Sequence, residues 1–132
     1  MALEYEFQLS DPRGPEELLA AAGIGQVAGL SLKPCPPTAA RVHIVREACG
    51  FTSRICLLMR RGSAGDHNLL RAVMALLKTS NGDAALFLNY ETPLLLRRQG
   101  KLMLNAECGW WRRPAMLELV DMPYSEESLP SL

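Results

Sequence analysis

The segment from Asp83 to Asn105 constrains the fold more than any other part of the chain. It contains three short apolar runs, and turn signals at Asn89–Pro93 and Arg98–Lys101 separate them. Short apolar runs bounded by Gly, Pro and Asn are typical of antiparallel strands, and Gly100 stands where a tight hairpin turn needs a positive φ. The segment therefore predicts a largely buried, three-stranded meander with strands at 84–88, 94–96 and 102–104.

The chain as a whole has room for one ordinary domain, because it contains 132 residues of which 48% are hydrophobic. No apolar run approaches the roughly 18 residues that a membrane helix needs. The first residues alternate acidic and apolar side chains, unlike a signal peptide. We therefore expect a cytoplasmic protein without membrane association. It should consist of a single domain over residues 1–121 and a flexible C-terminal tail over residues 122–132, which is rich in Ser, Pro and Glu.

Periodicity predicts the remaining elements. Strict alternation from Leu3 to Leu9 indicates a half-buried strand. A short helix is expected over 15–22, and a leucine-striped helix over 66–81 with Asp66 as its N-cap. Further strands are expected at 26–32, 41–46, 54–60 and 115–120, with a rigid proline-rich connection at 33–37. The order indicates an α+β fold, with a mainly antiparallel sheet of about six strands and two helices packed on one face.

The formal net charge is zero, but the charges are segregated along the chain. Residues 1–27 contain five acids and one base, residues 28–62 contain six bases and one acid, and the last fifteen residues contain acids without a base. The acidic ends either pair with the basic middle inside the fold or form faces of opposite sign, and pairing is the simpler expectation.

The candidate catalytic and metal-binding side chains do not form a recognisable constellation. The four cysteines include no C-x-x-C pair. Cys49 and Cys56 flank a predicted hairpin and could approach each other, although buried free thiols in a reducing compartment are the simpler expectation. Neither His43 nor His67 has a Cys, Asp or Glu at ligand spacing. We therefore predict no catalytic residue, no metal site and no cofactor.

Two sequence clusters are candidates for binding a protein partner. Tryptophan and arginine are enriched at the energetic centres of protein interfaces, and a predicted loop carries two of each. The acidic C-terminal region is the second cluster, and it would suit a basic partner. Basic residues near tryptophans can also bind single-stranded nucleic acid, but the zero net charge argues against it. The candidate partner-binding residues are Trp110, Trp111, Arg112, Arg113, Glu118 and Asp121.

About half of the chain resembles a bacterial family, the Sit swarming-inhibition immunity proteins. The resemblance lies in the start Met1–Tyr5, in Ala48–Phe51, in the leucine-rich helix that leads to Gly82–Glu91, and in Leu95–Asn105. In that family a glycine commonly occupies the place that Tyr90 has here. The resemblance implies an immunity protein that binds a toxin delivered by kin cells and neutralises it without chemistry.

A small ligand-binding or enzymatic domain, with a pocket between helix and sheet, is the alternative. A deep pocket that contains His43 or Cys56 beside a carboxylate would favour this alternative. If the chain is an immunity protein, the expected partner is a cognate protein toxin. The sequence also allows a homodimer.

Overall fold

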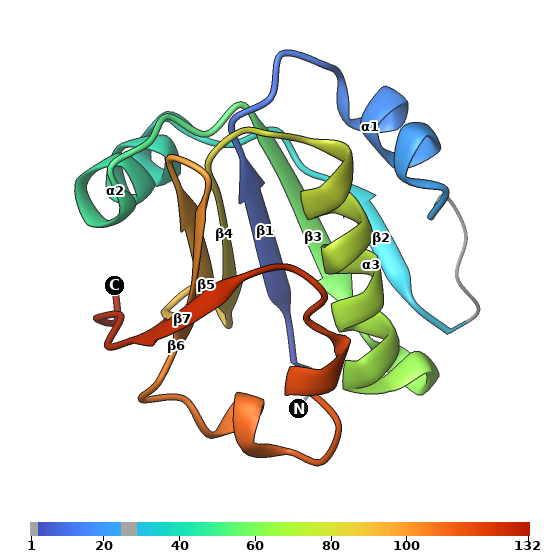
Figure 1. Ribbon diagram of the computed structural model, residues 1–132. Coiled ribbons are helices and arrows are strands. Elements are labelled where there is room, and N and C mark those ends of the chain that lie inside the picture. Colours follow the sequence, from blue (N-terminus) through green and yellow to red (C-terminus); the bar gives the residue numbers. More distant parts are fainter. Residues whose placement is uncertain (1–2, 25–28) are drawn as a thin grey trace.

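The computed structural model describes residues 3–24 and 29–132, which form one seven-stranded sheet with three α-helices (Figure 1). The strand order is β2-β3-β1-β4-β5-β6-β7, and every neighbouring pair is antiparallel except β6 and β7. The α+β class is therefore confirmed, with seven strands instead of about six.

The elements are β1 (Tyr5–Leu9), α1 (Pro15–Ala22), β2 (Ser31–Pro34), α2 (Ala39–Cys49), β3 (Ile55–Arg60), α3 (Gly65–Thr79), β4 (Ala84–Leu88), β5 (Thr92–Arg98), β6 (Lys101–Asn105) and β7 (Tyr124–Glu127), with short 3₁₀ turns η1 (Gly62–Ala64), η2 (Gly109–Arg112) and η3 (Leu117–Leu119).

Strand β1 lies near the middle of the sheet, between β3 and β4. The alternation of the sequence correctly predicted a strand here. The strand was expected to be half-buried, but all five of its residues are buried. Tyr5, Phe7 and Leu9 belong to the main apolar core, whereas Glu6 and Gln8 point to the other face. We call these the core face and the second face of the sheet. The strand is not half-exposed, because structure covers the sheet on both sides of it.

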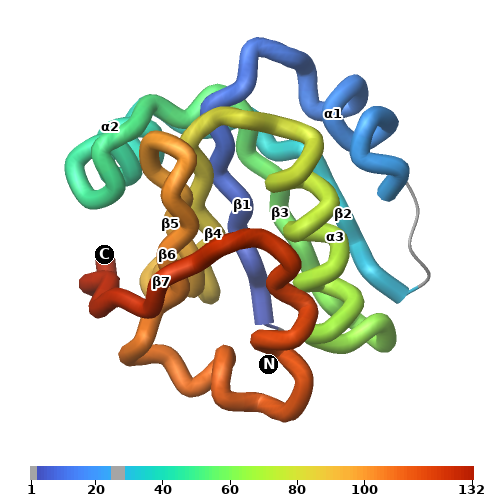
Figure 2. Tube along the Cα trace, in the orientation of Figure 1, coloured from blue at the N-terminus to red at the C-terminus, as the bar shows by residue number. Residues whose placement is uncertain are grey.

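Helices α1 and α3 cover the core face, and they lie together beside β2 and β3 in Figures 1 and 2. Both helices and the meander were predicted from the sequence. Asp66 does not cap α3, since no side-chain cap is present; it is buried and accepts a hydrogen bond from the Tyr5 hydroxyl at 2.8 Å. The C-terminal end of α3 is bound by buried Arg97, which donates to the carbonyls of Leu77 and Ser80.

Helix α2 corrects the prediction of a strand at 41–46. Thr38 caps the helix by accepting a hydrogen bond from the Arg41 amide at 3.1 Å, and Gly50 ends it at φ 78°. Only Val45 and Cys49 of this helix are buried, so its periodicity is weak. These two side chains pack on the second face of the sheet. The two predicted helices, α1 and α3, do share the core face, and α2 is a third helix on the other face.

The C-terminal region departs from prediction in a similar way. The strand expected at 115–120 is absent: these residues contain η3, and Ala115 has a φ of 66°. The last strand is instead β7, which lies in the segment expected to be a mobile tail and pairs with β6. The buried Asn105 amide also donates to the Leu129 carbonyl at 3.3 Å. The mobility of residues 122–132 stays a prediction. The strand expected at 26–32 lies partly outside the described residues, and β2 begins at Ser31.

The packing of α3 generates a stability prediction. Leu70 is fully buried against the core face, and its neighbour Arg71 is exposed. We expect Leu70→Asp to destabilise the domain by about 4 kcal/mol or more, because a carboxylate would lose its hydration without gaining a partner. Arg71→Asp is the matched control and should change stability by less than about 0.5 kcal/mol. Urea unfolding measures both, and equal midpoints for the two variants would contradict this packing.

Candidate functional site

The structure places the two tryptophans of the predicted partner-binding loop inside the core. Trp110 and Trp111 are 4% and 3% exposed. Their rings pack edge to face at 4.8 Å, and the Trp111 indole donates to the Leu94 carbonyl at 2.7 Å. A partner-binding role for the two rings would need them on the surface, and the structure instead places both in the main apolar core.

The charged candidates of that region remain on the surface but are not gathered into one site. Arg113 makes an ion pair with the buried Asp66 of α3, and this contact connects the loop to the helix. Asp66 also pairs with Arg61. Asp121 pairs with Lys78, and the hydrogen bond from that lysine lowers the pKa of Asp121. Arg112 and Glu118 are exposed and make no ion pair within the described part of the chain.

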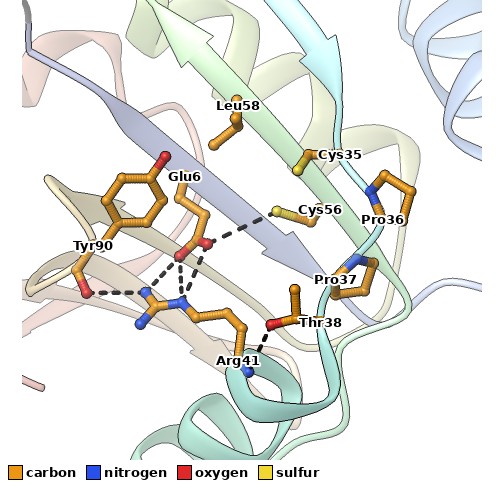
Figure 3. A pocket seen from close by; sticks show the side chains of 9 residues that line it. All are labelled: Glu6, Cys35, Pro36, Pro37, Thr38, Arg41, Cys56, Leu58 and Tyr90. Carbon is orange, nitrogen blue, oxygen red and sulfur yellow. Dashed lines mark hydrogen bonds and ion pairs between the residues drawn. The ribbon is translucent and has the colours of Figure 1, made fainter.

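A hollow of about 220 Å³ lies on the second face, where β1, β3, α2 and the segment after β2 meet (Figure 3). At its base Arg41 holds Glu6, with its Nε at 2.9 Å and 3.2 Å from the two carboxylate oxygens. Glu6 is 3% exposed, so its charge is stabilised by this guanidinium rather than by water. The lining residues are Glu6, Cys35, Pro36, Pro37, Thr38, Arg41, Cys56, Leu58 and Tyr90.

Tyr90 forms one wall of this hollow from the turn between β4 and β5. Asn89 and Tyr90 both have positive φ, at 51° and 65°, in a turn that favours Asn-Gly. A tyrosine in this region is strained by about 1–2 kcal/mol. Its carbonyl accepts from Arg41 at 3.0 Å, and its hydroxyl donates to Glu4 at 2.9 Å. Hydrogen bonds thus hold both the backbone and the side-chain hydroxyl of the strained Tyr90.

Cys56 lies in this hollow beside the Glu6 carboxylate, with its Sγ at 3.9 Å from Oε2. Burial, and then the negative charge of Glu6, raise the pKa of Cys56 to about 12. Burial likewise raises the pKa of Cys49 to about 11. The thiolate is the nucleophile, so both thiols are inert at neutral pH. All four cysteines are free, and the suggested pair Cys49 and Cys56 is not bonded.

The other candidates for chemistry lie away from this hollow. His43 and His67 are exposed, and Nε2 of His67 lies 2.8 Å from the Pro114 carbonyl. The described residues contain no group of three or more His, Cys, Asp or Glu side chains placed to hold a metal ion. Within residues 3–24 and 29–132, the hollow places no activated nucleophile beside a base, since its Cys56 thiol has a raised pKa.

Sequence analysis missed Glu6, Arg41 and Tyr90 as site residues. The segregation of charge contained part of the signal, since the acidic N-terminal segment pairs with the basic middle through Glu6–Arg41 and Glu4–Arg60. The pairing expected from the sequence is confirmed in these two contacts. The sequence did not identify Arg41 as the ion-pair partner of Glu6, because Arg41 was expected in a strand and lies in helix α2.

Comparison with known proteins identifies one family. A family model described as SitI3-like matches residues 3–115, which extend from β1 through η2 and exclude β7. Neither the curated proteins nor the solved structures gave a match.

The Glu6–Arg41 pair generates a prediction about stability. Arg41→Met should destabilise the protein by about 3–5 kcal/mol, because Glu6 would remain buried without a partner. Adding Glu6→Gln should recover at least about 1 kcal/mol of that loss. Arg60→Met is the control, since the Arg60–Glu4 pair is exposed and should contribute less than about 1 kcal/mol. Urea denaturation of the wild type and these three variants measures this, and a double variant that is no more stable than Arg41→Met would contradict the coupling.

The raised thiol pKa values generate a prediction about reactivity. At pH 8 a thiol with a pKa of about 12 is ionised in roughly one molecule in ten thousand. Half-buried Cys35 and Cys108 should therefore react with iodoacetamide first, and Cys49 and Cys56 should react only after unfolding or at high pH. Mass spectrometry of the alkylated peptides measures the order. Rapid alkylation of native Cys56 at pH 7 would instead indicate an activated nucleophile.

Proposed function

The chain belongs to the SitI3-like family, and we propose that it is an immunity protein that binds and neutralises a cognate toxin delivered by kin cells. The family match over residues 3–115 carries the proposal, because it includes six of the seven strands and all three α-helices. The name of the family points to immunity in swarming inhibition, and neutralisation by binding is the function that we infer for this chain.

The chemistry of the second face supports binding rather than catalysis. An immunity protein of this kind acts by occluding its toxin and needs no reactive group. The buried thiols have raised pKa values, and the Glu6 carboxylate is held by Arg41. These groups favour a rigid recognition surface over a catalytic centre.

A small ligand-binding or enzymatic domain is the second candidate, because Cys56 lies beside a carboxylate in a hollow. A deep pocket with Cys56 beside a carboxylate is the feature expected of such a domain. Two properties weigh against it: the raised pKa of Cys56, and a volume of about 220 Å³, which is below the roughly 300–1,000 Å³ of most ligand pockets. The immunity function is therefore the better supported of the two.

The partner and the location follow from this proposal. The toxin would meet the protein in the cytoplasm of the recipient cell, without a cofactor and without nucleic acid. None of the described helices combines the length and apolar character of a membrane span. Arg112, Arg113, Glu118 and Asp121 stay candidates for contacting the toxin, with the buried Trp110 and Trp111 supporting their loop. A homodimer also stays a prediction.

A competition experiment tests the proposed function. Recipients that deliver no toxin themselves and also lack this gene are mixed with their toxin-producing parent, and their survival is counted with and without the gene restored. We expect the deleted recipients to die at least about tenfold more often, because nothing occludes the incoming toxin. Growth of the deleted strain alone is the control and should be normal.

Two outcomes of that experiment would contradict the proposal. Equal survival of the deleted and restored recipients in the mixture would remove the immunity function. A growth defect of the deleted strain alone, with no further loss in the mixture, would favour a ligand-binding or enzymatic role.

A further inference from the structure

Three adjoining hollows run along β2 and β3 and form a continuous surface that we call the β2–β3 furrow. The hollow at Glu6 shares Leu58 with a second hollow of about 130 Å³ at Ser31, Lys33 and Arg60. It shares Cys35, Pro36, Pro37 and Cys56 with a third hollow of about 230 Å³, which reaches Pro15 and Arg54. The furrow thus extends from the second face around the end of edge strand β2.

The charge of the furrow is positive. Four cations line it, and the one carboxylate among its lining residues, Glu6, is already held by Arg41. Arg60 pairs with Glu4. Lys33 and Arg54 are exposed and make no ion pair in residues 3–24 and 29–132. Unpaired cations without a competing acid favour an acidic ligand.

The apolar part of the furrow is unusual for a surface that faces only water. Leu58 is half-buried and belongs to neither apolar cluster of the fold, and it lines the same hollow as Pro36, Pro37 and Tyr90 (Figure 3). Tyr90 keeps its bulky ring at a φ of 65°, where glycine would be unstrained. Backbone strain of this kind is concentrated at functional sites, where surrounding contacts hold it in place.

We propose that the β2–β3 furrow is the surface that binds the toxin, and that it takes an acidic segment of that protein with one apolar side chain inserted beside Leu58 and Tyr90. The carboxylates of the segment would face Lys33 and Arg54. Pro34 has no N–H to donate at the β2 edge, which disfavours addition of a further strand at that position. The inference rests on the proposed immunity function and gives that function a binding surface and a partner chemistry.

The same competition experiment tests the furrow with two variants. Lys33→Glu combined with Arg54→Glu should lower recipient survival by about tenfold or more, since reversed charges repel an acidic segment. Tyr90→Gly should lower survival as well while keeping or raising the melting temperature, because it removes the ring and the strain together. Thermal unfolding of each purified variant verifies that it is folded.

Two further variants separate the furrow from other surfaces. Arg71→Glu with Lys101→Glu makes the same change in net charge at exposed residues outside the furrow, and it should protect as the wild type does. Glu118→Lys with Glu126→Lys is not a neutral control; it tests the acidic C-terminal region as the competing binding surface.

Each outcome of this experiment has a definite meaning. Loss of protection confined to the furrow variants supports the proposal. Protection by the folded furrow variants overturns it, and loss only in the Glu118 and Glu126 variant would assign binding to the acidic region instead. If the wild-type chain itself gives no protection, the immunity function fails, and the furrow proposal fails with it.

Discussion

The burial of Glu6 near the middle of the sheet is the interaction on which the second face depends. A carboxylate that is 3% exposed needs a fixed positive partner, and Arg41 provides it from the first turn of α2. This contact brings α2 to the second face, together with the Thr38 cap and the prolines before it. Arg41 also binds the carbonyl of Tyr90 and lies over the ring of Phe87 at 5.0 Å. One ion pair therefore connects the central strand, a helix and a turn around one hollow.

The two faces of the sheet consequently have different roles. The core face is closed by α1, α3 and the two tryptophans, and its side chains form one continuous apolar core. The second face is covered only in part, by a smaller cluster around Val45, Cys49 and Phe87. A well-packed core supports a rigid backbone, and the incomplete cover leaves hollows whose lining side chains are held in place. This combination suits a protein that acts by binding.

Much of the fold could be predicted from the sequence, for local reasons. The meander and helices α1 and α3 have strong periodicity and clear turn residues, so their signals do not depend on distant contacts. Helix α2 was missed because Val45 and Cys49 are its only buried residues, although Thr38 and Gly50 are ordinary helix-capping signals. Strand β7 was missed because its polar sequence pairs at the edge of the sheet through the backbone, without burying side chains.

The sequence by itself determined the α+β class, the antiparallel meander, the main helix and the tendency of acidic and basic segments to pair. These properties follow from local periodicity and charge. Only the tertiary structure decided which residues form a site, because Glu6, Arg41, Cys56 and Tyr90 come from four separate segments. It also decided that the tryptophans belong to the core, since burial depends on what packs over a side chain. Whether a bulky or charged residue faces water or protein is set by contacts that lie far away along the chain.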